Sequence, residues 1–295
     1  MTMVKMVAVD MDGTFLDDKK QYNRARFQAC YQEMKRRGIK FVVASGNQYY
    51  QLKSFFPDIA SEIAFVAENG AWILDRDEEL FCGAFSREDV NAVLDTLQRG
   101  NYPNLKYILC GRNSAYHFNT MDEQWLVKMR HYCHRLKAID SLADVGDDRL
   151  FKFALNLSDD YVDILMADIE RLHQGAAAAT SSGHGSVDLI VPGLHKANGL
   201  RLLQQRWDIS SDEVLAFGDG GNDLEMLVQS RFSFAMQNAP QRVKDAARYG
   251  APSNNQEGVL QVIEQMLAGE GPFAGLISNG QHALPERLRR RATRR

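Results

Sequence analysis

Two acidic clusters stand at the ends of apolar runs, one near each end of the chain. The first is Asp-Met-Asp-Gly-Thr at residues 10–14, which follows the apolar run 4–9. A run of that length and valine content, bounded by Gly13, is typical of a buried strand. Residues two apart on an extended chain point the same way, so Asp10 and Asp12 are expected to face one point. Like charges at close range need a cation or a proton between them, which suits a nucleophile, a general acid/base and a Mg²⁺ ion.

The second cluster is Gly-Asp-Gly-Gly-Asn-Asp at residues 218–223, directly after the apolar run 214–217. Glycines let the backbone approach a ligand closely. Asp219 and Asp223 supply oxygen ligands suited to Mg²⁺, and Asn222 adds an amide. The simpler interpretation of both clusters is a polar turn after a strand, because Asp, Asn and Gly are common turn residues.

Two further segments place polar groups at predicted helix starts. Ser45 and Gly46 follow the predicted strand 39–44 and offer a hydroxyl and backbone N–H groups, which could bind a phosphate. The simpler alternative is that Ser45 is an ordinary N-cap residue. The charge of Lys196 opposes the helix dipole at its predicted position, and a bound phosphate would offset that cost. The preceding His195 is more simply a capping or surface histidine.

Jointly, the four segments supply a nucleophile, a second carboxylate, a hydroxyl donor, a cation and a metal clamp. A phosphoryl group passing through a metaphosphate-like transition state needs that set. The sequence therefore predicts phosphoryl-transfer chemistry.

Alternating strand and helix patterns position these groups. Buried strands are predicted at 4–9, 39–44, 64–67, 189–191 and 214–217, a hairpin at 71–83, and helices at 23–37, 196–207, 222–229, 240–247 and 257–268. Between them the pattern changes to alternating strands at 105–110, 151–157 and 176–181, with helices at 86–99, 122–136 and 160–172. The first pattern favours a parallel sheet with its site at the carboxyl ends of the strands, and the second an α+β module.

The simplest topology is a discontinuous core with an inserted module. We expect residues 1–84 and 188–272 to form the core, 85–187 the inserted domain, and 273–295 a basic, disordered tail. Residues 283–295 carry a net charge of +5, which by subtraction from the total of −3 leaves about −8 for the rest. The negative net charge of the residues outside this segment argues against nucleic-acid binding by the folded domains.

Composition places the chain among ordinary globular proteins. It has 295 residues, of which 45% are hydrophobic and 25% charged. The sequence contains no apolar stretch long enough to span a bilayer and no pattern of a signal peptide. Its four cysteines are scattered, which favours buried reduced thiols and a cytoplasmic location.

The order of these motifs resembles the haloacid dehalogenase (HAD) superfamily of aspartyl-phosphate phosphatases. The large insertion resembles its Cof-type branch, which has a class IIB cap. Within that branch, residues 41–50, 65–70 and 188–199 are similar to sugar phosphatases, and the likeness runs through about residue 273. The resemblance implies a Rossmann-like α/β fold, with a parallel-sheet core and an inserted α+β cap domain.

The resemblance also implies residue roles. Asp10 would be the nucleophile and Asp12 the general acid/base. The phosphate-binding residues would be Ser45, Gly46, Lys196 and Asn222. The Mg²⁺ ligands would be Asp10, the carbonyl of Asp12 and Asp219, with Asp223 supporting. The implied activity is Mg²⁺-dependent hydrolysis of small phosphorylated sugars through an aspartyl-phosphate, by a monomer or weak homo-oligomer that binds no nucleic acid or membrane.

Other activities share parts of this set. A phosphomutase of the same superfamily has a similar core and cap domain but returns the phosphoryl group to the sugar. A phospho-accepting signalling domain is one contiguous flavodoxin-like unit, whereas the acids here extend from Asp10 to Asp223. Candidates for selecting the leaving group are residues 68–70, residues 182–185 and Lys152. Their simpler interpretations are turn residues, a surface histidine and a lysine on the solvent face of a strand.

Overall fold

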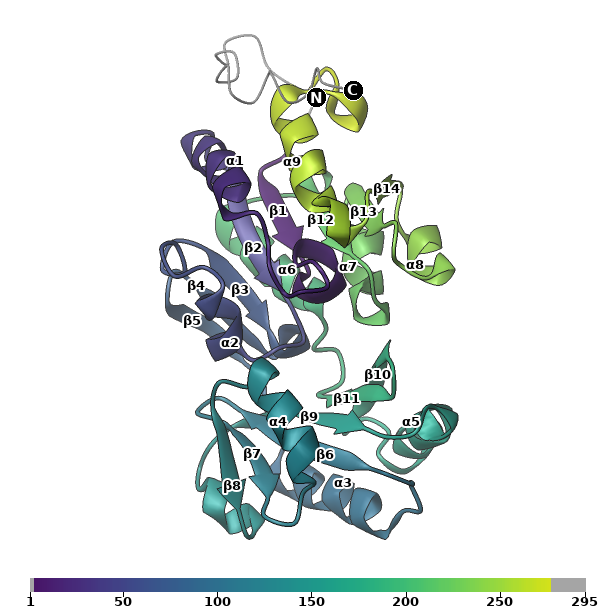
Figure 1. The fold of residues 1–295 in the computed structure, drawn as a ribbon. Coiled ribbons are helices and arrows are strands. Elements are labelled where there is room, and N and C mark those ends of the chain that lie inside the picture. The colour runs from purple at the N-terminus through teal and green to yellow at the C-terminus, as the bar shows by residue number, and fades with distance from the viewer. Residues whose placement is uncertain (1–2, 277–295) are drawn as a thin grey trace. The chain divides into compact units, whose positions relative to one another are not determined.

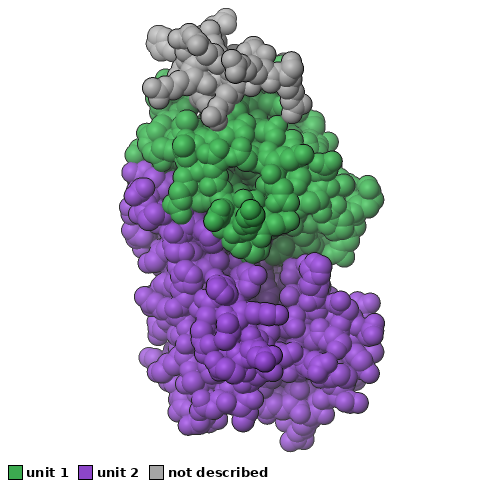
Figure 2. All heavy atoms as spheres, viewed as in Figure 1, with its two compact units in different colours: residues 1–44, 201–295 green, residues 45–200 purple. Residues whose placement is uncertain are grey.

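The computed structural model describes residues 3–276. Two compact units divide the chain: Met1–Ala44 with Arg201–Arg295, and Ser45–Leu200 (Figure 2). The first unit is therefore assembled from both ends of the chain, and the second is one continuous segment.

Parallel strands form the centre of the first unit (Figure 1). In the order β14-β13-β12-β1-β2 they are Tyr249–Ala251, Phe232–Met236, Val214–Gly218, Met6–Val9 and Lys40–Ala44. Strands β1, β12 and β13 are buried along their whole length, as a parallel sheet covered on both faces requires. In this register Val9 is paired with both Val43 and Phe217, so the chain leaves β1, β2 and β12 at one edge of the sheet.

Helices of the first unit are α1 (Arg24–Arg36), α7 (Leu224–Gln229), α8 (Gln241–Ala246) and α9 (Gly258–Ala268). Phe27 of α1 packs on Phe15 and Phe41, with ring centroids 5.2 and 5.0 Å apart. Arg26 of α1 also donates to Glu264 of α9 at 2.9 Å. This packing holds the segment that follows β1 against the sheet.

The second unit contains α2 (Tyr49–Ser54) and the antiparallel strands β3 (Ala64–Ala67), β4 (Trp72–Asp75) and β5 (Glu78–Cys82). It also contains a six-stranded sheet, which in the order β10-β11-β9-β6-β7-β8 comprises Ala178–Gly183, Ser186–Ile190, Leu150–Asn156, Lys106–Gly111, Ala115–Phe118 and Leu136–Ile139. That sheet is mixed, because β7 and β8 are parallel and the other pairs are antiparallel.

Three helices accompany the six-stranded sheet: α3 (Arg87–Arg99), α4 (Glu123–Tyr132) and α5 (Val162–Leu172). Val93 of α3 and Leu165 of α5 lie in one apolar cluster with Phe153 of β9. Both helices begin with acidic residues in their first turn, where the helix dipole favours them. The remaining long helix, α6 (Lys196–Trp207), begins directly at a candidate site residue.

The predicted fold class is confirmed: the chain is α/β, with a Rossmann-like parallel-sheet core and an inserted α+β domain.

One predicted helix is too long. The segment 122–136 is helical only to Tyr132, and Leu136 begins the edge strand β8, in which only Ile139 is buried. Strand β11 also extends to Ile190 within the six-stranded sheet, three residues past the predicted end of the insertion. The predicted domain boundaries themselves stay a prediction.

Two composition-based predictions concern the cysteines and the tail. All four cysteines are free, and Cys30, Cys110 and Cys133 are buried. Phe273, the first residue of the predicted tail, is buried and packs on Phe232, with ring centroids 5.1 Å apart. The arginine-rich segment 283–295 lies outside the described residues.

Within residues 3–276, every helix is too short or too polar to cross a membrane.

Candidate active site

Three carboxylates gather where β1 and β12 end. Asp10 follows β1, Asp219 follows β12, and Asp223 closes the short 3-10 turn Gly221–Asp223. One oxygen from each lies within 4.8 Å of the others, and both Asp10 and Asp223 are buried. Because like charges this close repel one another, the group favours a bound cation.

Hydrogen bonds fix two of the three acids. The backbone N–H groups of Asp219 and Gly220 both donate to Oδ2 of Asp223 at 3.0 Å. The hydroxyl of Thr14 donates to Oδ1 of Asp219 at 2.9 Å, which ties the first motif to the second. These contacts hold the carboxylates in place before any ligand arrives.

Two glycines make this approach possible. A Cβ on Gly13 would lie 2.2 Å from Oδ2 of Asp219, and Gly13 also has a φ of +73°. A Cβ on Gly218 would lie 2.5 Å from the Cβ of Asp223. Both distances are far inside van der Waals contact, so each motif needs a glycine at this place.

The donor set fits a divalent metal ion. Mg²⁺ prefers oxygen ligands and is commonly held by a small number of carboxylates together with water and substrate oxygens. Asp10, Asp219 and Asp223 offer oxygens only, and they come from two strand ends held rigidly by the parallel sheet. The residues present could therefore hold Mg²⁺.

Asp12 has a different environment. Its carboxylate is half-exposed and forms an ion pair with Lys20 at 2.8 Å, and it is not a member of the three-acid group. The structure thus brings the Asp10 side chain, but not that of Asp12, into the predicted metal site. Asn222, the other predicted residue of this region, is half-buried and immediately precedes Asp223.

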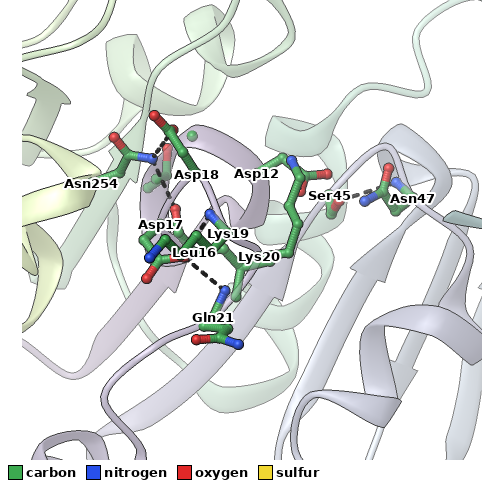
Figure 3. Close-up of polar contacts among 12 residues, drawn as sticks. Asp12, Leu16, Asp17, Asp18, Lys19, Lys20, Gln21, Ser45, Asn47 and Asn254 are labelled. Carbon is green, nitrogen blue, oxygen red and sulfur yellow. Dashed lines mark hydrogen bonds and ion pairs between the residues drawn. The ribbon is translucent and has the colours of Figure 1, made fainter. Parts of the chain in front are cut away.

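Ser45 and Gly46 follow β2 in a turn that precedes α2. The hydroxyl of Ser45 accepts from the backbone N–H of Asn47 at 3.0 Å, as Figure 3 shows. Our expectation that Ser45 lies at a helix N-terminus is wrong, because α2 begins only at Tyr49 and Gln48 is its N-cap residue. The local Ser45–Asn47 hydrogen bond closes a turn instead, which delays the helix.

Lys196 is the first residue of α6 and is almost completely buried, with 1% of its surface exposed. A buried ammonium is costly unless it is paired, so this position is not that of an ordinary surface lysine. The neighbouring His195 is half-buried, and its Nδ1 makes no hydrogen bond with any described residue.

Sequence reasoning missed three asparagines that contact the segment after β1, residues 11–18. Asn238 donates to the carbonyl of Gly13 at 2.8 Å. Asn254 donates to the carbonyl of Leu16 at 3.0 Å and to Asp18 at 3.1 Å (Figure 3). Hydrogen bonds from Asn255 and Asn254 also lower the pKa of Asp18. Asparagines in polar turns gave no signal that could distinguish them from ordinary turn residues.

The candidates for selecting the leaving group have different surroundings. His184 is exposed, in the turn between β10 and β11, which agrees with its simpler interpretation. Glu68, Asn69 and Lys152 are all buried. The simpler interpretation of Lys152, a lysine on the solvent face of a strand, is therefore wrong.

Known proteins are similar to this chain in sequence and in fold. Residues 7–263 match the family model for haloacid dehalogenase-like hydrolases. The chain is 51% identical over 270 residues to the 5-amino-6-(5-phospho-D-ribitylamino)uracil phosphatase YbjI of Escherichia coli (strain K12), covering 92% of this chain and 98% of that protein. It is also 25% identical to the phosphatase of the same description, YwtE, of Bacillus subtilis (strain 168), over 90% of this chain and 99% of the relative.

A solved structure gives the same result. SMU.1108c from Streptococcus mutans UA159 superposes with a TM-score of 0.86 at 38% identity, covering 90% of this chain and 99% of that one. The family match spans both compact units and includes the three clustered acids. This chain therefore belongs to the haloacid dehalogenase-like hydrolase family.

Proposed function

We propose that the protein is a Mg²⁺-dependent phosphatase that hydrolyses small phosphorylated sugars and related polyol phosphates. The observation that carries the proposal is the gathering of Asp10, Asp219 and Asp223 at the ends of β1 and β12. A group of three acids, two of them buried, gives no benefit to folding by itself, because its charges repel. It is useful to a protein that binds a metal beside a nucleophile.

In this proposal Asp10 attacks the phosphorus in line, forms an aspartyl-phosphate and releases the sugar oxygen. Asp12 donates a proton to that oxygen and later accepts one from the water that hydrolyses the intermediate. Its side chain is partly exposed, so water can reach the carboxylate. Bound Mg²⁺, held by Asp10, the Asp12 carbonyl, Asp219 and Asp223, would offset the charge of the phosphate.

Ser45, Gly46, Lys196 and Asn222 are proposed to bind the phosphate oxygens. Lys196 contributes a fixed positive charge, and a desolvated cation interacts more strongly with a phosphate than an exposed one does. Ser45 and Gly46 follow β2, whose end lies in register with that of β1. Support for these roles comes from the family membership and from the burial of Lys196 and Ser45.

The substrate class follows from two sources. The motifs resemble those of sugar phosphatases, whereas the names of two relatives specify a ribitylaminouracil phosphate. Both kinds of molecule carry a phosphate ester on a short polyhydroxylated chain. We therefore propose that class as the substrate.

The test is a panel of phosphate esters assayed for phosphate release, with and without Mg²⁺. The panel contains sugar phosphates, polyol phosphates, 5-amino-6-(5-phospho-D-ribitylamino)uracil and nucleotides. We expect release from polyhydroxylated esters that requires Mg²⁺ and stops on chelation. Transfer of phosphate to a second position of the sugar, with a need for a bisphosphate activator, would instead indicate a phosphomutase. Stable phosphorylation without release would indicate a signalling domain.

A further inference from the structure

Lys152 lies on β9 of the second unit and is almost completely buried, with only 6% of its side chain exposed. Its ammonium forms an ion pair with Glu68 at 2.9 Å and donates a hydrogen bond to the carbonyl of Gly46. A buried charge needs such partners, because they replace the water it has lost. Lys152 is thus fixed beside the turn that is proposed to hold phosphate.

The segment that meets Lys152 has unusual backbone geometry. Glu68 and Asn69 have φ values of +54° and +58°, a left-handed conformation that side chains rarely adopt. The backbone N–H of Asn69 donates to the carbonyl of Ser45 at 3.0 Å, and its side-chain amide donates to Asp188 at 2.7 Å. Strained backbone persists where the surroundings enforce it, and such places cluster at binding sites.

Asp188 also lies near Lys152, but the two side chains do not form a direct hydrogen bond. Its Oδ2 is 3.9 Å from the ammonium of Lys152, too far for a direct hydrogen bond. Its side chain is 25% exposed, so a ligand can reach the carboxylate of Asp188. Burial lowers the pKa of Lys152, but the carboxylates of Asp188 and Glu68 raise it well above its ordinary value, so the group stays an ammonium.

We propose that Lys152 and Asp188 bind one hydroxyl of the substrate's leaving group and so determine specificity. An oxygen placed at about 2.8 Å from both atoms fits a separation of 3.9 Å, accepting from Lys152 and donating to Asp188. Because Lys152 also holds Gly46, the hydroxyl belongs to a carbon near the phosphate ester. This inference rests on the proposed function and assigns to it the pair that recognises a polyhydroxylated chain.

The experiment compares each polyol or sugar phosphate with its monodeoxy analogues, beginning with the hydroxyl nearest the ester, for example ribose 5-phosphate with 3-deoxyribose 5-phosphate. For the wild type we expect kcat/KM to fall about 10- to 100-fold for the analogue that lacks the recognised hydroxyl. In Asp188→Ala the ratio between the two substrates should approach one, because the hydroxyl has lost its acceptor. Asp163→Asn, an exposed acid on α5, is the matched control and should keep the wild-type ratio.

The ratio separates recognition from structural damage, which would lower kcat/KM for both substrates together. Lys152→Arg should keep part of the discrimination and Lys152→Met should lose it. A ratio in Asp188→Ala equal to that of the wild type would overturn the inference, as would a wild type indifferent to every deoxy analogue. A wild type that releases phosphate from no ester at all would overturn the proposed function, and this inference with it.

Discussion

Asp10 is the residue on which the proposed chemistry depends most directly. Asn in its place keeps the size and one oxygen but is not a nucleophile. We expect Asp10→Asn to reduce phosphate release at saturating Mg²⁺ by about 10⁴-fold or more. Asp12→Asn should cost about 10²- to 10⁴-fold, the usual contribution of a general acid/base. Near-normal turnover of Asp10→Asn in a phosphate-release assay would remove Asp10 from this role.

Gly13 allows a test of the close approach between the two motifs. In Gly13→Ala the new Cβ would meet the carboxylate of Asp219, so Asp219 must move out of the three-acid group. We expect the Mg²⁺ concentration that gives half-maximal activity to rise by about tenfold or more, since a misplaced ligand weakens metal binding. A titration of activity against Mg²⁺ measures it.

Gly38 provides the matched control for Gly13. Its φ of +70° is almost the same, but nothing lies within 4 Å of the Cβ that alanine would add. Gly38→Ala should therefore lose about 1 kcal/mol of stability through backbone strain, without changing the Mg²⁺ requirement. If both variants shifted the Mg²⁺ titration equally, the effect would come from backbone strain and not from the contact with Asp219.

At the scale of elements, the segment after β1 depends on the turn that precedes α9. Asn254 is buried and donates to the carbonyl of Leu16, a residue with no exposed surface. Asn254→Ala leaves that carbonyl without its partner, which should lower the free energy of unfolding by about 1–3 kcal/mol. It should also lower kcat by about 10- to 100-fold, because the segment carries Asp12, the proposed general acid/base, and small displacements of such a group are costly.

Asn255→Ala is the control for this prediction. Asn255 lies on the same turn but is exposed, and the hydrogen bonds of its side chain within the described part of the chain are to the exposed Asp18. We expect its loss of stability to be about 0.5 kcal/mol or less, with kcat unchanged. Denaturant unfolding and steady-state kinetics measure both variants. An Asn254→Ala enzyme with reduced stability and full kcat would show that the contact supports folding alone.

For the whole molecule, the sequence could predict the parts that depend on local pattern. The continuous apolar runs of β1, β2 and β12 indicated a parallel sheet, and their shared edge explains why Asp10 and Asp219 meet. The motif spacing identified the three clustered acids. Patterns of this kind are reliable because a strand buried on both faces tolerates few polar residues.

Features that depend on tertiary contacts could not be predicted. The edge strand β8 has one buried residue in four, so its sequence gives no alternation to detect. The sequence around Lys152 predicts a lysine on the solvent face of a strand, and its tertiary contacts with Glu68 and Gly46 explain its burial. Asn238 and Asn254 act on Gly13 and Leu16, which are more than 200 positions away in the chain. No local pattern contains such information.

The three clustered acids also predict how Mg²⁺ changes the stability of the whole protein. Their repulsion destabilises the folded state when no cation is bound, and Mg²⁺ that binds only the folded state stabilises it by mass action. At a concentration of about 100 times Kd the gain is about 2.7 kcal/mol. We therefore expect the melting temperature of the wild type to rise with Mg²⁺ and to fall on chelation.

Asp219→Asn separates repulsion from ordinary packing. Asn keeps an oxygen that accepts from Thr14, so the hydrogen bond seen at 2.9 Å is retained while one negative charge is removed. In the presence of a chelator this variant should melt at a higher temperature than the wild type, but it should gain little from Mg²⁺. Asp212→Asn, an exposed acid outside the group, should respond to Mg²⁺ as the wild type does. A metal site shared by the three acids predicts both effects of Asp219→Asn, the relief of repulsion and the loss of Mg²⁺ binding. If Mg²⁺ raised the melting temperature of Asp219→Asn as much as that of the wild type, the cation would bind elsewhere.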